Sequence, residues 1–166
     1  MKIEDVPSFY QVYVRNVING GLMESLQSSG EELYHVCKDL DESQALYRYK
    51  EDKWSIKDLV QHLTDSERVF GYRAMRFARN DQTELSGFDQ NDFVDVAFAD
   101  KFGMKDLVRS FQNVRQSSID LFSTFSESDL AKKGKSNGVE MSVAMIGLII
   151  SGHTLHHLNI IKQHYI

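Results

Sequence analysis

The sequence predicts an all-α protein that folds as a four-helix bundle with one long crossover. Three observations support this prediction. Four long segments repeat apolar residues with a period near 3.6, which is typical of an α-helix with one buried face. Proline occurs once, at Pro7, so helices can extend over most of the chain. No segment alternates apolar and polar residues with a period of two, so we expect no β-strand.

The first long helix is predicted over residues 22–39, after a shorter helical piece over residues 7–17. Pro7 suits the first turn of that piece, where its missing amide proton costs no hydrogen bond. The inward face of the long helix consists of apolar residues and the one cysteine of the chain: Leu22, Leu26, Leu33, Val36 and Cys37. We interpret Cys37 as an inert core residue, because a buried free cysteine behaves as a small apolar side chain.

The second long helix is predicted over residues 56–79. Ser55 and Asp58 form a capping-box pattern at its start, since the serine hydroxyl can accept a hydrogen bond from a free amide of the first turn. The inward side of this helix is largely apolar, but it also carries His62, between Leu59 and Leu63.

The third and fourth long helices are predicted over residues 104–125 and 142–164. The connection over residues 80–103 is long for neighbouring helices of a bundle. We expect it to cross one end of the bundle and to help build a site. The length of 166 residues suits one domain, residues 1–166.

The composition argues against several kinds of partner. A formal net charge of -5 repels a phosphate backbone, so we predict no nucleic-acid partner. The longest apolar run, residues 143–150, is far shorter than a ~20-residue membrane span, and the N-terminus lacks the apolar region of a signal peptide. One cysteine permits no disulfide within the chain. These features predict a cytoplasmic protein without a membrane partner.

Two histidines of the fourth helix, His153 and His157, lie only ~40° apart around the helix and one turn apart. Their stripe also carries Ile146 and Ile150, so it should face the bundle interior. Protonated imidazoles are costly there, and a divalent ion with Zn–N distances of ~2.0–2.1 Å resolves that conflict. The alternative is a pair of core histidines without a metal ion.

His62 is the predicted third ligand, because it lies on the apolar side of the second helix. Three neutral imidazoles leave coordination positions for water or substrate, which is typical of a reactive site. His156 lies ~60° from His153 and is expected at the rim of the site, while His164 lies ~10 Å beyond His157 along the axis. His35 follows a glutamate at the spacing of di-iron bundles, but a second such motif is missing, so we reject a di-iron site.

Two motifs resemble a known family. Residues 54–67 resemble the Trp-Ser plus His-Leu-x-Asp signature of the DinB-like superfamily, which includes the YfiT-type proteins. Residues 152–157, Gly-His-Thr-Leu-His-His, resemble the Gly-His-x-x-His-His element of its last helix. The stretches 77–81 and 85–89 also look like family segments. The resemblance covers essentially the whole chain, and the two histidine motifs in this order are its most specific part.

The resemblance implies an up-down-down-up bundle, often a homodimer, that binds nickel or zinc. By position the implied ligands are His62, His153 and His157. Family members with known activity use a low-molecular-weight thiol, as bacillithiol transferases or mycothiol-dependent isomerases, and others are assigned as metal-dependent hydrolases. The family often has an acidic residue directly after the first histidine of the last helix. This chain departs from the pattern there, with Thr154.

Two acids are candidate catalytic residues. Asp65 lies ~60° from His62 on the same helix and can orient its ring by accepting the second N–H. Asp89, with Asp92 nearby, lies in the long connection and can reach an open coordination position. The alternative for each acid is a solvated surface position. Arg73 and Arg76 are expected either to form ion pairs or to bind a distant substrate carboxylate.

Three functional hypotheses follow from these residues. The first is a metal-dependent thiol S-transferase that acts on small-molecule electrophiles, because a metal ion lowers the pKa of a bound thiol. The second is a metal-dependent hydrolase, which needs a carboxylate base within ~3 Å of the attacking water. The third is a dimeric metal-binding bundle without catalytic activity.

Overall fold

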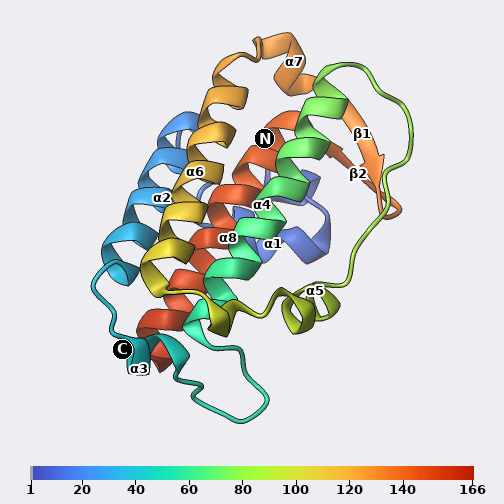
Figure 1. The fold of residues 1–166 in the computed structure, drawn as a ribbon. Helices are drawn as coiled ribbons and strands as arrows, with labels where there is room; N and C mark the ends of the chain where they lie inside the picture. Colours follow the sequence, from blue (N-terminus) through green and yellow to red (C-terminus); the bar gives the residue numbers. More distant parts are fainter. Residues whose placement is uncertain (1) are drawn as a thin grey trace.

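The computed structural model describes residues 2–166. Four long helices form the bundle: α2 (Leu22–Cys37), α4 (Ile56–Ala78), α6 (Met104–Ser123) and α8 (Val143–His164). In Figure 1, α4 and α6 run in one direction, and α2 and α8 run in the opposite direction. The long connection joins the two parallel helices α4 and α6. The predicted four-helix bundle with up-down-down-up order is therefore confirmed, and each predicted helix end lies within one turn of the observed one.

The shorter elements lie at the ends and one side of the bundle (Figure 1). They are η1 (Ile3–Asp5), α1 (Ser8–Val14), α3 (Glu42–Leu46), α5 (Gln90–Ala97), η2 (Ala99–Lys101) and α7 (Glu127–Ala131). The predicted piece over residues 7–17 contains α1, and the predicted crossover contains α5 and η2.

The start of α4 is held by the predicted capping box. The Ser55 hydroxyl accepts from the Asp58 amide at 3.1 Å, and the Asp58 carboxylate accepts from the Ser55 amide at 2.9 Å. A capping box satisfies amides that the first turn leaves free. Arg48 adds an ion pair to the same carboxylate at 2.7 Å. This anchored first turn sets the position of His62, which lies further along the same helix.

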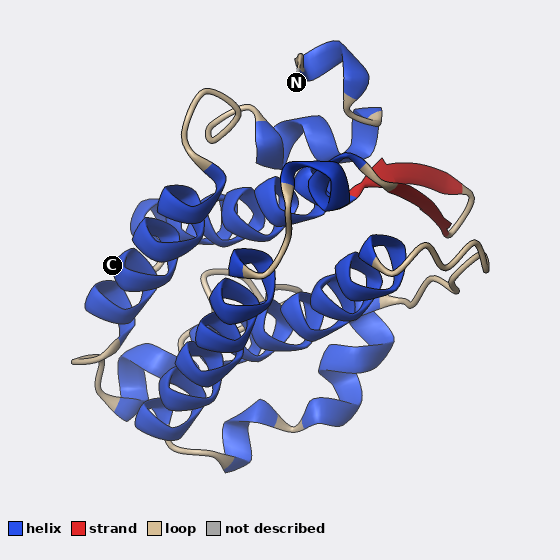
Figure 2. Ribbon diagram, turned by 90° about the horizontal axis from the view of Figure 1, so that it is seen from above, coloured by secondary structure: helices blue, strands red, loops and turns tan. Residues whose placement is uncertain are grey.

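A short β-hairpin contradicts the expectation that the chain has no strand. β1 (Lys133–Ser136) and β2 (Val139–Ser142) pair antiparallel at one edge of the molecule (Figure 2). Asn137 and Gly138 form the turn with φ values of 50° and 76°. Four-residue strands are too short for a period of two to stand out in the sequence. The Asn-Gly pair was the usable signal, because both turn residues of a tight hairpin need positive φ.

The core consists of two clusters of buried apolar side chains, and α8 contributes to both. Among the described residues, α8 is the helix that is long and apolar enough to cross a membrane. However, 72% of its most apolar stretch is buried inside the bundle. The packing of α8 against α1, α2 and α4 therefore accounts for its apolar composition.

Gly152 allows α1 to approach α8 closely, so we expect a larger residue at this position to destabilise the protein. A Cβ at Gly152 would overlap with the backbone carbonyl of Tyr13 in α1. We expect Gly152→Ala to displace α1 and to lower the free energy of unfolding by about 1–3 kcal/mol, the usual cost of overpacking. Chemical denaturation of both proteins measures this difference.

Gly71→Ala is the matched control for this prediction. Gly71 also lies inside a long helix, but nothing lies within 4 Å of the Cβ position. Alanine has the higher helix propensity, so this variant should gain about 0.5–1 kcal/mol. Equal stabilisation of both variants would show that α1 does not restrict residue 152.

Candidate metal centre

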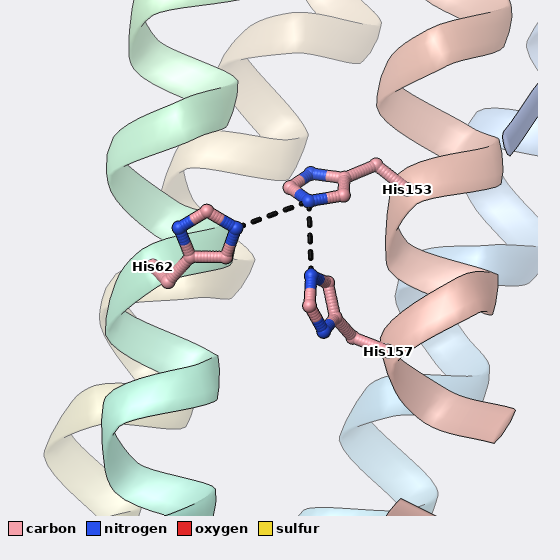
Figure 3. A group of neighbouring side chains, drawn as sticks. All are labelled: His62, His153 and His157. Atoms are coloured by element: carbon pink, nitrogen blue, oxygen red, sulfur yellow. Dashed lines mark hydrogen bonds between the residues drawn. The ribbon is translucent and has the colours of Figure 1, made fainter. Parts of the chain in front are cut away.

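Three histidine side chains from two helices meet inside the bundle (Figure 3). His62 comes from α4, and His153 and His157 come from α8. The Nε2 atom of His153 lies 3.1 Å from Nε2 of His62 and 3.0 Å from Nε2 of His157. All three residues are buried: His62 is 4% exposed, His153 is 6% exposed and His157 is 9% exposed. The structure therefore brings together the three histidines that the sequence analysis selected.

Aromatic rings enclose these histidines. The ring of Trp54, just before α4, lies 4.8 Å from the His62 ring between centroids. Tyr13 of α1 lies 4.9 Å from the ring of His153 by the same measure. Close packing against these rings restricts the histidine rotamers and excludes water from one side of the cluster.

Burial keeps the three imidazoles neutral. It lowers the pKa of His62 to about 4, and the nearby negative charge of Asp65 offsets only part of this effect. Burial lowers the pKa of His153 and His157 well below the usual histidine range, and the neighbouring histidines lower both pKa values further. Neutral imidazole is the form that binds metal ions.

The donor geometry fits a bound metal ion. Three nitrogens at ~2.0–2.1 Å from one tetrahedral ion lie roughly 3.3–3.4 Å from one another, close to the observed spacings. A neutral imidazole has one donor and one acceptor nitrogen, so Nε2 of His153 cannot form a good hydrogen bond with both neighbours. The buried triad can therefore hold a metal ion.

Asp65 does not contact the histidine that it was expected to orient. Its carboxylate accepts from Gln61 Nε2 and from Arg68 Nη1, each at 2.8 Å. These three residues line a separate groove of about 690 Å³ between α4, α5 and α6. The hydroxyl of Ser66 instead lies 3.5 Å from Nδ1 of His62. His62 and Ser66 are four residues apart on one helix, and this spacing was the sequence signal that could have predicted their contact.

Asp89 is not among the residues that line the cavity beside the histidines. It caps α5, and its carboxylate accepts from the Asn91 amide at 2.8 Å. The crossover nevertheless contributes to the site through its uncharged neighbours Phe88 and Gln90, which line a cavity beside the histidines. The expectation that the crossover helps to build a site therefore holds for these residues.

The remaining histidines lie outside the triad. His156 packs against Tyr13 and His157 at the edge of the site, as expected for a rim position. His164 stacks on Tyr49 near the C-terminal end of α8, and His35 is exposed on α2. None of these three belongs to the group of converging ligand atoms among the described residues.

A cavity of about 160 Å³ adjoins His62 and His153. Its wall is mainly aromatic and polar: Phe9, Tyr10, Tyr13, Ser66, Phe70, Arg73, Gly87, Phe88, Gln90 and Asn137. The sequence analysis named only Arg73 among these as a candidate for ligand binding. The others come from α1, α4, the crossover and the hairpin, and their convergence depends on tertiary packing. The cavity gives a small molecule access to the histidines.

Cys37 is not a candidate nucleophile at this site. Its side chain is fully buried in α2, and burial raises its pKa to about 12. The thiolate is the reactive form, so we expect almost no reaction with a disulfide reagent from neutral to mildly alkaline pH. Denaturant should restore rapid labelling of one thiol. Rapid labelling of the folded protein would contradict the buried position.

Comparisons with known proteins identify a family and a similar solved structure. The family model of the DinB superfamily matches residues 25–161. A solved structure of YfiT from Bacillus subtilis, described as a probable metal-dependent hydrolase with an unusual four-helix bundle topology, superposes with a TM-score of 0.70. The match covers 86% of this chain and 85% of that chain at 14% sequence identity, and it shows a common fold. A search of curated proteins found no match.

Proposed function

The chain belongs to the DinB superfamily, and from that premise we propose that it is a metal-dependent thiol S-transferase of the bacillithiol type. His62, His153 and His157 would hold one nickel or zinc ion. The observation that carries this proposal is the convergence of three neutral Nε2 atoms beside a cavity that opens to small molecules. A divalent ion on three imidazoles keeps coordination positions free and lowers the pKa of a thiol that binds there.

The protein side chains have defined tasks in this proposal. The two helices α4 and α8 hold the imidazoles close together, so the ligands would need only a small adjustment when the ion enters. Trp54 and Tyr13 pack on the histidine rings and limit the entry of water. In the transfer itself, a sulfur–carbon bond forms on the electrophile, the leaving group departs with the bonding electron pair, and the thiol proton passes to solvent.

The main alternative is a metal-dependent hydrolase, as YfiT is described. A hydrolase needs a carboxylate base close to the attacking water. Among the described residues, the cavity wall contains no aspartate or glutamate. Asp65 and Asp89 make their hydrogen bonds elsewhere. This absence of an acid in the wall favours thiol transfer over hydrolysis.

A paired assay tests the proposal. The nickel- and zinc-loaded proteins are incubated with monochlorobimane and either bacillithiol or free cysteine, and with a p-nitrophenyl ester in a parallel sample. We expect thioether formation with bacillithiol above the uncatalysed rate, and loss of this activity in His153→Ala. Ester hydrolysis without thiol transfer would replace the proposal with the hydrolase alternative. A loaded protein inactive in both assays would support a metal-binding bundle without catalysis.

A further inference from the structure

Arg73 is a buried cation without an anionic partner. Its residue is 4% exposed, and it forms no ion pair within residues 2–166. Its one hydrogen bond to the described chain runs from Nη2 to the carbonyl oxygen of Ser86, at 2.9 Å. A guanidinium has five N–H donors, so most of its donors are not used by the protein.

The other buried cations of the bundle are paired. Lys57 donates to the carboxylate of Glu42, and Arg115 forms an ion pair with Glu67 at 2.8 Å. A buried charge is costly unless an opposite charge and hydrogen bonds compensate it. Arg73 is the exception among these side chains, and it is also the one that lines the cavity beside the histidines.

Two aromatic rings position the Arg73 guanidinium. Its central carbon lies 5.5 Å from the centroid of Phe70 and 5.9 Å from that of Phe88. Such cation–π contacts compensate part of the lost hydration and leave the in-plane donors free. Burial lowers the pKa of Arg73, but a guanidinium stays protonated at neutral pH. The same cavity wall contains Tyr10. Burial raises the pKa of Tyr10, so its hydroxyl stays protonated.

The cavity connects this cation to the proposed metal centre. His62, Ser66, Phe70 and Arg73 follow one another along a single side of α4, and all four line the cavity. Its volume of about 160 Å³ is close to the ~150 Å³ of an engineered cavity that holds benzene. A ligand enclosed by it is therefore about the size of one aromatic ring.

We infer that Arg73 is an anion-binding residue that selects small substrates bearing a carboxylate, with the carboxylate on the guanidinium and the rest of the molecule directed toward His62 and His153. This inference deepens the proposed function and rests on it for the reaction, but the binding step itself needs no metal ion. The planar guanidinium beside these two rings favours the planar carboxylate group, which can accept two parallel N–H bonds.

Calorimetry on the metal-free protein tests the inference. The probes are benzoate, the neutral and isosteric benzamide, and inorganic phosphate. We expect benzoate to bind about ten-fold more tightly than benzamide, which corresponds to one charge-assisted hydrogen-bonded pair. Arg73→Gln should lose this preference, and Arg73→Lys should keep part of it. Equal affinity for benzoate and benzamide, or tighter binding of phosphate than of benzoate, would overturn the assignment.

Arg76→Gln provides the matched control. Arg76 lies on the same helix, pairs with Asp81 and does not line the cavity, so this variant should keep the benzoate preference. Loss of the preference in Arg76→Gln but not in Arg73→Gln would also overturn the assignment. Metal content measured on the same samples separates the two proposals. If the protein prefers benzoate but binds no metal, the proposed function is wrong and the role of Arg73 stands. If it binds metal but does not prefer benzoate, only the role of Arg73 is wrong.

Discussion

Replacing His153 or His157 with alanine is expected to abolish metal binding while the helices remain largely intact. Each change removes one of three imidazoles whose ligand nitrogens lie within 4.8 Å of one another. Loss of a residue that merely supports a metal ligand costs about 10–100-fold in affinity, so loss of a ligand should cost more. The fold should persist, because the apolar contacts of α8 with two core clusters do not involve the imidazole rings.

The measurement is elemental analysis after incubation with nickel or zinc, with far-ultraviolet circular dichroism on the same samples. His156→Ala is the matched control, because His156 lies on the same helix and contacts His157 but is not one of the converging ligands. This control should load like the unchanged protein. Full loading of His153→Ala or His157→Ala would show that the triad is a set of core histidines without a metal function.

The long helices and the histidine triad could be predicted from sequence because both depend on local periodicity. A helix that buries one face repeats apolar residues at 3.6-residue spacing, and that repeat fixes which side of α4 carries His62. The i,i+4 pair on α8 follows from the same geometry. Only the meeting of the two helices needed a tertiary assumption, and any compact bundle of four helices brings inward histidines at similar depth close together.

The polar partners around the triad could not be predicted in the same way. Asp65 is close to His62 around the helix, but its carboxylate binds Gln61 and Arg68 toward the neighbouring groove. Such a choice depends on rotamers and on the elements that pack nearby, which periodicity does not describe. Tyr13 illustrates the same limit, since it reaches His153 only because Gly152 lets α1 approach α8.

A buried ion pair joins α4 and α6, and the sequence analysis did not predict it. Arg115 donates to both carboxylate oxygens of Glu67, at 2.8 and 2.9 Å. It also donates to the Leu26 carbonyl and the Ser29 hydroxyl of α2, and to the Thr154 hydroxyl of α8. One guanidinium thus joins all four long helices. Thr154 serves as a hydrogen-bond partner of this network.

Glu67→Ala is expected to lower the free energy of unfolding by about 3–5 kcal/mol, because it leaves the guanidinium of Arg115 buried without a counter-charge. Chemical denaturation gives the value. The double variant Glu67→Leu with Arg115→Met removes both charges and restores apolar volume, so it should be clearly more stable than Glu67→Ala. Glu32→Ala is the control, since Glu32 pairs with Lys162 at the exposed surface and its loss should change stability by less than about 1 kcal/mol. If Glu67→Ala were no less stable than Glu32→Ala, water would have to reach Arg115, and the four helices could not depend on this pair for their packing.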